Sequence, residues 1–284
     1  MALIHANFFS VSLGMERQVD VILPQEANGI GQKGKEGSGK VPVLYLLHGA
    51  SDDQTIWQRR TSIERYAVAK GLAVVMPSTD LGFYTDQKYG YDYFQYFSKE
   101  LPDLINEFFP MISEKREDTF VAGLSMGGFG AFKLGINCPE RFSYAASLSG
   151  FLDPVLAAEN ATRKPNENNF GTLEELRGSV NDLPAKLEEQ LAKKVKLPRF
   201  FQACGTEDFL YAMNVKFRDT FKDRIDLVYY EEPGTHEWGF WDRNIQRVLD
   251  WLPLEKAAEK KAVKAEKNPV RRGSATVRPA GKEG

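Results

Sequence analysis

The stretch 119–135, TFVAGLSMGGFGAFKLG, constrains the fold more than any other part of the chain. A short apolar run ends in Gly-Leu-Ser-Met-Gly, and a helical pattern of apolar residues follows at once. This order predicts a strand, a sharp turn and a helix, with Ser125 at the apex of the turn. A strained turn brings the backbone close to itself, and Gly123, Gly127 and Gly128 supply the small residues that this requires. The turn is expected to present the Ser125 hydroxyl to a substrate.

The G-x-S-x-G pattern is weak evidence by itself. A chain with 24 glycines in 284 residues is expected to match it by chance in about one case in ten. The alternative interpretation of Ser125 is a helix N-cap beside glycine-rich packing. The pattern gains weight only if a base, an acid and an anion-binding loop lie elsewhere in a workable order.

Composition limits the class of protein. With 42% hydrophobic content the chain can bury a full core, as one large domain or two small ones. Its two cysteines, Cys138 and Cys204, predict no disulfide framework. Residues 1–18 alternate like a strand and lack the pattern of a signal peptide, and no run approaches the ~18 apolar residues of a membrane span. We therefore expect a cytoplasmic protein without a membrane-spanning segment.

Charge is distributed unevenly along the chain. The formal net charge is -2, but residues 255–284 hold nine Lys or Arg against four Glu, so residues 1–254 carry -7. An acidic body argues against nucleic acid as the main partner. Residues 255–284 have no apolar face to bury, which predicts a disordered basic tail after a folded domain at 1–254.

Eight segments have the pattern of strands. The first two alternate in polarity and are expected to pair antiparallel, whereas some later ones are continuous apolar runs typical of strands buried on both faces. The segments are 3–13, 17–23, 41–47, 72–76, 119–122, 144–148, 199–203 and 226–231. Helical patterns follow the later strands, among them 56–70, 211–221 and 238–251. This alternation predicts an α/β fold with a mostly parallel, eight-stranded sheet covered on both faces.

Two stretches interrupt the alternation. Residues 151–198 are polar, include the run PNENN and carry short amphipathic segments. Because they are inserted between two core strands, they predict a small cap over one end of the sheet. Residues 28–40 contain five glycines and predict a surface loop, since they lack the G-K-[ST] ending of a phosphate-binding loop.

A nucleophilic serine needs a base, and the sequence holds three histidines. His5 lies in the first predicted strand, where a structural role is expected. His48 directly follows a core strand and precedes a glycine, so it would orient that loop or act as a base. His236 lies in the turn between the last predicted strand and the last helix, which should return it over the strand that carries Ser125. We predict that His236 is the base, with a surface-turn histidine as the alternative.

The base in turn needs a carboxylate that fixes its tautomer and stabilises its charged form. Glu207 and Asp208 both follow the seventh predicted strand, in a loop that should lie beside the histidine loop. The turn that Gly205 allows and the shorter side chain favour Asp208. Asp153, after the preceding strand, and Asp182, in the predicted cap, are weaker candidates.

Attack on an ester creates an oxyanion, which must be met by N–H donors that are already in place. One donor is expected to be the backbone N–H of Met126, directly after the serine. The second should come from the loop after the third predicted strand, as the N–H of Ala50 or, alternatively, of Gly49. Serine, aspartate and histidine then follow one another in the order found in α/β hydrolases.

Five motifs together carry a family resemblance. They are LLHGASDDQTIW, MPSTDLGFYTD, VAGLSMGGFGAFKLG, CGTEDF and PGTHEWGFWD, within a resemblance that runs from about residue 3 to 252. They resemble the esterase D-type or tributyrin-esterase-like branch of the α/β hydrolases. The resemblance implies an α/β-hydrolase fold, hydrolysis of carboxylic esters with small acyl groups, a triad of Ser125, Asp208 and His236, and no cofactor. No metal site is predicted.

The expected partner is a small-molecule ester with an acetyl to butyryl-like acyl group. Aromatic residues crowd the segment 83–97, and we hypothesise that they bound the acyl and alcohol pockets together with parts of the cap. The candidate pocket residues are His48, Phe83, Tyr84 and Trp238. Plain core packing is the alternative for each aromatic residue.

Two rival functions remain open at this point. The same branch includes S-formylglutathione hydrolases, which cleave a thioester and often rely on a reactive cysteine; neither Cys138 nor Cys204 is obviously placed for that. A non-catalytic binding module on the same fold is the other rival. The sequence also leaves a homo-oligomer open.

Overall fold

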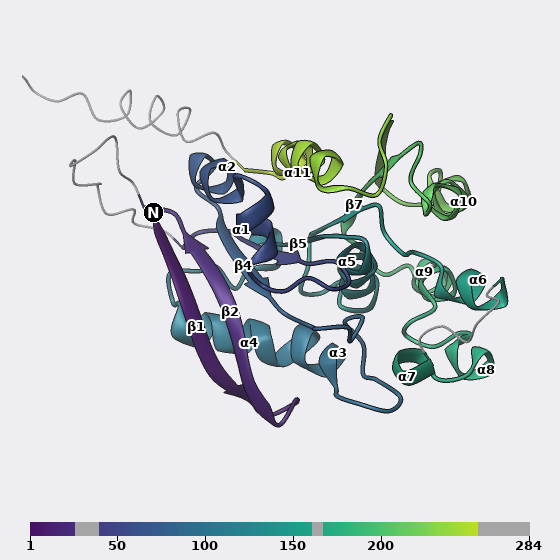
Figure 1. Cartoon of the computed structure of the whole chain (residues 1–284), viewed down its shortest axis with the longest axis horizontal. Coiled ribbons are helices and arrows are strands. Elements are labelled where there is room, and N and C mark those ends of the chain that lie inside the picture. The colour runs from purple at the N-terminus through teal and green to yellow at the C-terminus, as the bar shows by residue number, and fades with distance from the viewer. Residues whose placement is uncertain (26–39, 161–166, 255–284) are drawn as a thin grey trace, which may run out of the picture. The chain divides into compact units, whose positions relative to one another are not determined.

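The computed structural model describes residues 1–25, 40–160 and 167–254. These residues belong to one unit, Met1–Leu254, in which a sheet carries helices on both faces (Figure 1). The predicted tail at 255–284 and all but Lys40 of the predicted loop at 28–40 lie outside the described residues. Residues 161–166 of the predicted cap lie outside them as well.

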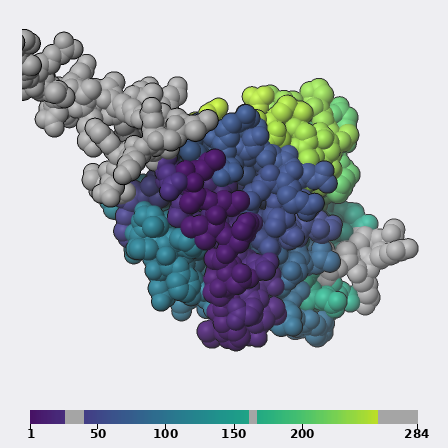
Figure 2. Space-filling model, turned by 60° about the vertical axis from the view of Figure 1, so that its left-hand side comes forward, coloured from purple at the N-terminus to yellow at the C-terminus, as the bar shows by residue number. Residues whose placement is uncertain are grey.

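The sheet is antiparallel at one edge and parallel elsewhere. β1 pairs antiparallel with β2 and β2 with β4, and the remaining pairs are parallel. Across the described residues the order is β1-β2-β4-β3-β5-β6-β7-β8, and Figure 2 shows the N-terminal strands, in purple, at the surface. The strands are β1 Ala2–Ser10, β2 Met15–Leu23, β3 Val43–Leu47, β4 Ala73–Pro77, β5 Thr119–Leu124, β6 Tyr144–Leu148, β7 Arg199–Gly205 and β8 Leu227–Glu232. The predicted mostly parallel, eight-stranded sheet is confirmed.

Helices pack on the two faces because side chains alternate along each buried strand. In β3, Tyr45 points into the core under α4, α5 and α10, whereas Leu44 and Leu46 point into the core under α1, α2 and α11. The helices are α1 Ile56–Arg60, α2 Ile63–Ala69, α3 Tyr93–Gln95, α4 Leu101–Phe108, α5 Met126–Asn137, α6 Pro154–Glu159, α7 Glu167–Phe170, α8 Leu173–Leu176, α9 Leu183–Ala192, α10 Tyr211–Phe221 and α11 Trp238–Trp251. A π-helical turn, Tyr96–Glu100, joins α3 to α4, and a 3-10 turn, Arg116–Asp118, precedes β5.

The single helix predicted at 56–70 is wrong, because two helices occupy this segment. Between α1 and α2, Thr61 has an extended backbone with φ -137° and ψ 173°. Its hydroxyl donates to the Trp57 carbonyl at 2.6 Å and accepts the Ile63 N–H at 3.1 Å. A side-chain hydroxyl that competes for backbone partners ends the first helix, so the chain starts again at Ile63.

The segment between β6 and β7 contributes the short helices α6 to α9, which Figure 1 shows grouped near α5. Thr172 and Glu175 form a capping box at the start of α8, and Asp182 caps α9 by accepting the Ala185 N–H at 3.2 Å. These caps let helices of four to ten residues form in a polar sequence. The division into a catalytic domain and a cap stays a prediction.

A buried lysine ties this segment to the loop after β4. Lys133, in α5, is fully buried, and its Nζ donates to the Asn181 side chain at 2.6 Å and to the Tyr84 carbonyl at 3.0 Å. Thr85 donates to the same Asn181 oxygen at 2.6 Å. Burial holds the pKa of Lys133 well below its ordinary value. One side chain of α5 therefore links two segments that are far apart in the sequence.

Lys133 should make the stability of the fold depend on pH in the alkaline range. Since its native pKa lies below its unfolded pKa of about 10.4, the unfolded chain binds the extra proton between these values, and stability rises with pH. The free energy of unfolding of the wild type minus that of Lys133→Met should therefore increase from pH 8 to pH 10, by at most about 1.4 kcal/mol per pH unit because one proton is involved. Urea unfolding of both proteins at the two pH values measures this difference; a constant difference would contradict the interpretation.

Candidate active site

Ser125 lies in the turn between β5 and α5. Its backbone has φ 52° and ψ -116°, a left-handed conformation that costs a serine energy. Hydrogen bonds on both sides hold it: its N–H donates to the Leu148 carbonyl at 2.8 Å, and its own carbonyl accepts from Phe129 at 3.1 Å and Phe151 at 3.3 Å. The surrounding structure therefore enforces the strained turn that the sequence predicts.

Glycines make this turn sterically feasible. A Cβ on Gly123 would lie 2.3 Å from the Gly127 carbonyl oxygen, and a Cβ on Gly127 would lie 2.5 Å from the Leu47 carbonyl oxygen. Neither backbone can move away without shifting a central strand or α5. The close approach of the turn to β3 thus depends on the absence of side chains at these positions.

The structure brings Ser125, His236 and Asp208 together from three loops. His236 Nε2 lies 3.0 Å from Ser125 Oγ, and His236 Nδ1 lies 2.8 Å from Asp208 Oδ2. The Asp208 side chain is fully buried, whereas that of His236 is 18% exposed. The arrangement gives the hydroxyl a proton acceptor and gives that acceptor a carboxylate on its far side.

The Asp208 carboxylate is held in its charged form. Burial raises the pKa of Asp208. Three contacts oppose burial and outweigh it: hydrogen bonds from the His236 ring and from the Leu210 N–H, and the Ser149 side chain. The pKa of Asp208 therefore lies below its ordinary value. A charged carboxylate keeps the proton of the neutral imidazole on Nδ1. His236 Nε2 is then free to accept a proton from the serine.

The other candidate acids make different contacts. Glu207 is exposed and accepts the Gly234 N–H at 2.5 Å. Asp153 caps α6 and pairs with Lys216 at 3.0 Å, and Asp182 caps α9. Of the four carboxylates considered from the sequence, the structure places Asp208 against His236.

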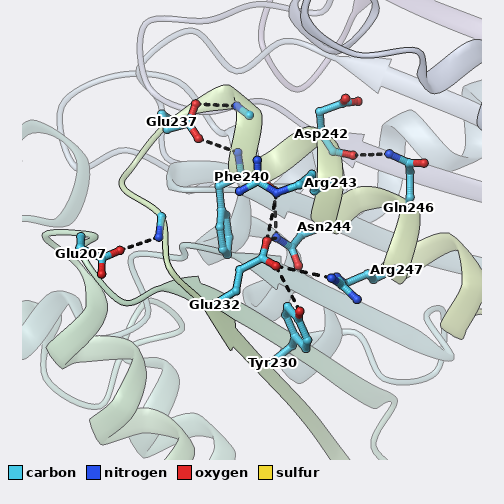
Figure 3. A network of polar contacts seen from close by, with 12 residues as sticks. Glu207, Tyr230, Glu232, Glu237, Phe240, Asp242, Arg243, Asn244, Gln246 and Arg247 are labelled. Carbon is cyan, nitrogen blue, oxygen red and sulfur yellow. Dashed lines mark hydrogen bonds and ion pairs between the residues drawn. The ribbon is translucent and has the colours of Figure 1, made fainter.

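Polar contacts also fix the loop between β8 and α11 that carries His236, as Figure 3 shows. Glu207 holds this loop twice, because its carboxylate accepts the Gly234 N–H while its own N–H donates to the Gly234 carbonyl at 3.1 Å. Glu237 caps α11 by accepting two N–H groups of its first turn, at 2.7 and 2.9 Å. The loop is therefore held by hydrogen bonds both before His236, at Gly234, and after it, at Glu237.

Glu232 anchors the end of β8 to α11 in the same view (Figure 3). Its carboxylate accepts hydrogen bonds of 3.0 to 3.4 Å from Tyr230, Arg243, Asn244 and Arg247. These donors hold the pKa of Glu232 below its ordinary value although partial burial opposes them. The last strand and the last helix are thus fixed relative to each other on either side of the histidine loop.

His48 and Tyr84 support the loop after β3. His48 is buried; its Nδ1–H donates to the Gly49 carbonyl at 2.7 Å, and its Nε2 accepts the Thr79 N–H at 3.0 Å. Burial lowers the pKa of His48. Tyr84 is fully buried and donates to the His48 carbonyl at 2.8 Å. The side chains of His48 and Tyr84 both bind backbone groups. These contacts suit the loop-orienting role for His48. Tyr84 lies behind the loop, away from any surface that a ligand could reach.

The predicted oxyanion loop lies beside the serine. A Cβ on Gly49 would lie 3.6 Å from Ser125 Cβ, an ordinary contact, and 2.5 Å from Leu124 Cδ1, so a side chain at this position would require the Leu124 side chain to shift. Met126 begins α5 directly after Ser125, where N–H groups at a helix start lack helical partners. The choice of donor between Ala50 and Gly49 stays a prediction.

The two remaining pocket candidates lie in aromatic clusters. Phe83 packs against Phe129, Phe151 and Phe170 with ring centroids 5.4 to 6.3 Å apart. Trp238 is half-buried and packs against Trp57 at 5.3 Å and Trp241 at 5.2 Å. Phe151 donates its N–H to the Ser125 carbonyl, so the Phe83 cluster reaches the serine turn.

Sequence reasoning missed two aromatic neighbours of His236. The Trp241 ring stands perpendicular to the imidazole at 4.9 Å, and the Phe209 ring lies 4.5 Å from it. Trp241 also donates from Nε1 to the Ser149 hydroxyl at 3.1 Å. The available signals were the position of Phe209 directly after the acid and the repeat of tryptophan three residues apart at the start of α11.

Within residues 1–25, 40–160 and 167–254, no three His, Cys, Asp or Glu side chains gather as a metal site would need. None of the helices in the described part of the chain has the length and apolar content to cross a membrane.

The α/β-hydrolase fold has this strand order and carries a serine turn at the end of a central parallel strand. Serine hydrolases have the same hydrogen-bonded series from serine through histidine to aspartate. The chain belongs to the esterase family, whose model, described as "Putative esterase", matches residues 10–252. It is a carboxylic ester hydrolase.

Known proteins similar to this chain agree with that family. An acetyl esterase of Caldicellulosiruptor saccharolyticus is 32% identical over 89% of this chain and 98% of its own length. The solved structure of FphF, a fluorophosphonate-binding serine hydrolase of Staphylococcus aureus, has a TM-score of 0.79 at 33% identity and covers 88% of this chain and 98% of that one. An S-formylglutathione hydrolase (FrmB) from S. aureus has a TM-score of 0.77 at 32% identity, with the same coverage.

Proposed function

We propose that this esterase hydrolyses short-chain acyl esters, from acetyl to butyryl-like, through an acyl-enzyme on Ser125. The observation that carries the proposal is the hydrogen-bonded series of Ser125 Oγ, His236 and Asp208, at 3.0 and 2.8 Å. The similarity to an acetyl esterase over nearly the whole chain supports the small acyl group.

The proposed mechanism has two acyl transfers. Ser125 Oγ attacks the ester carbonyl while its proton passes to His236 Nε2, and the oxyanion is met by the N–H groups of Met126 and the loop at 49–50. His236 then gives the proton to the leaving alcohol as the bond between the carbonyl carbon and the alcohol oxygen breaks. Water repeats the attack on the acyl-enzyme and releases the acid. Asp208 stabilises the imidazolium in both steps.

Acyl-chain length tests the pocket part of the proposal. Because Phe83 and its aromatic neighbours fill space beside the serine turn, kcat/KM for p-nitrophenyl esters should fall about tenfold or more from four to eight acyl carbons. Phe83→Ala should raise the ratio of eight-carbon to two-carbon activity about tenfold by opening this space. Phe108→Ala, an exposed phenylalanine on α4, is the control. A flat chain-length profile, or one unchanged by Phe83→Ala, would contradict this pocket.

A second candidate is hydrolysis of S-formylglutathione, since one similar structure carries that name. The cysteines do not favour it. Burial raises the pKa of Cys138 to about 12 and also raises that of Cys204, so both thiols stay protonated at neutral pH. Parallel assays should give a higher kcat/KM on p-nitrophenyl acetate than on S-formylglutathione; the reverse order would favour the thioester.

We also propose a cytoplasmic location, because both cysteines are free and buried, as suits a reducing compartment. A homo-oligomer stays a prediction, which light scattering on the purified protein tests.

A further inference from the structure

Phe209 is an exposed aromatic residue at the rim of the candidate site. It is 76% exposed, more than any other phenylalanine in the described residues, although Asp208 before it and Leu210 after it are buried. Because the ring is exposed, it contributes little of the stabilisation that burial of an aromatic side chain would add to the folded state. Its position therefore calls for a reason other than core packing.

The backbone holds Phe209 in a fixed place. The Asp208 N–H donates to the Gly205 carbonyl at 3.1 Å, and the Asp208 carbonyl accepts from Tyr211 at 2.9 Å. The Leu210 N–H donates to the Asp208 carboxylate at 2.8 Å. Hydrogen bonds on both sides of Phe209 mean that its backbone is already in place before a ligand binds, so little backbone ordering is needed on binding.

The ring contacts the histidine that handles the leaving group. Phe209 and His236 have centroids 4.5 Å apart at an interplanar angle of 48°. Trp241 contacts the same imidazole but is only 5% exposed. Of these two aromatic neighbours, Trp241 belongs to the core and Phe209 offers its surface to a ligand.

The direction of proton transfer places the alcohol portion of the ester beside His236 and Phe209. For the ester bond to break, the alcohol oxygen must come within about 3 Å of His236 Nε2 to receive the proton taken from Ser125. The atoms next to that oxygen then lie close to the imidazole, and Phe209 is the exposed apolar side chain that contacts it. The acyl group instead hangs from the carbonyl carbon attacked by Ser125.

Charge at this rim disfavours an anionic alcohol. The exposed Glu207 carboxylate precedes Asp208 in the same loop, and hydrogen bonds from Thr206 and the Gly234 N–H hold its pKa below the ordinary value. It is therefore ionised at neutral pH. A negatively charged group on the alcohol would be repelled, whereas a neutral apolar group would not.

We propose that Phe209 recognises the alcohol portion of the substrate and selects esters of neutral, apolar alcohols, aromatic ones above all. The inference rests on the proposed ester hydrolysis and adds the class of the leaving group. The competing explanation is that Phe209 only shields His236 from water, in which case its removal would slow all esters equally.

Benzyl acetate and ethyl acetate separate the two explanations. Both give the same acetyl-enzyme, so a difference in kcat/KM between them arises in acylation, while the alcohol is still present. Phe209→Ala should lower kcat/KM for benzyl acetate about tenfold more than for ethyl acetate, with Phe209→Leu between the wild type and Phe209→Ala. Release of acetic acid is followed by pH-stat titration, which needs no chromogenic leaving group.

Phe108→Ala removes another exposed phenylalanine, on α4, and should leave the benzyl-to-ethyl ratio unchanged. Thermal unfolding verifies that each variant is folded, and Phe209→Leu carries the test if Phe209→Ala is not. An equal loss on both esters, or an unchanged ratio, overturns the inference while the proposed function stands. A wild type inactive toward both acetates overturns the proposed function itself.

Discussion

Ser125→Ala is expected to lower kcat for p-nitrophenyl acetate by about 10⁵-fold or more, because it removes the atom that forms the acyl-enzyme. The same variant should lose all labelling by a fluorophosphonate probe, and mass spectrometry of the labelled wild type should place the probe on Ser125. The backbone of the turn is held by neighbouring carbonyl and N–H groups rather than by the hydroxyl, so the variant should fold. A label on another residue would contradict the proposed nucleophile, and no label on an inactive wild type would favour the binding module.

Ser125→Gly provides a matched control for this experiment. It removes the same hydroxyl but relieves the left-handed backbone, φ 52° and ψ -116°, which alanine tolerates no better than serine. Both variants should be inactive, and Ser125→Gly should be more stable than Ser125→Ala by about 1 kcal/mol in urea unfolding. Equal stabilities would mean that the turn stores no strain at this residue.

Asp208→Ala is expected to lower kcat by about 10³ to 10⁴-fold with a small effect on KM, since His236 then loses the carboxylate that fixes its tautomer and stabilises its charged form. Glu207→Ala, one residue earlier, should lower kcat by about tenfold or less, because it removes one hydrogen bond that supports the histidine loop. The pair of variants tests the assignment of the acid directly.

Two further variants sharpen this comparison. Glu207→Gln keeps an oxygen that can accept the Gly234 N–H and should recover most of the activity lost in Glu207→Ala. Glu231→Ala removes a carboxylate from the same end of the sheet that contacts Tyr211 and Arg218 rather than the histidine loop, and it should leave kcat unchanged. If Glu207→Ala proved as damaging as Asp208→Ala, the assignment of the acid to Asp208 would be wrong.

Much of the architecture could be predicted because its signals are local. The continuous apolar runs at β3 and β4, the alternation of β1 and β2, and the glycine-flanked Ser125 each depend on residues that are close in the sequence. The break at Thr61 could not be predicted, since it depends on whether a hydroxyl bonds to Trp57 and Ile63 or to water. The role of His48 likewise depended on a partner, Thr79, from a different strand end.

By itself, the sequence determined the sheet, the serine turn and the order of the candidate residues, because periodicity and glycine spacing act within a few residues. Only the tertiary structure decided which of two adjacent carboxylates, Glu207 or Asp208, meets His236. A Cβ on Gly205 would lie 2.1 Å from the Gly234 carbonyl oxygen, so the two loops touch, and this contact sends Asp208 inward while Glu207 holds the loop from outside. In the same loop, Phe209 faces the solvent beside the base, whereas Asp208 and Leu210 on either side of it are buried.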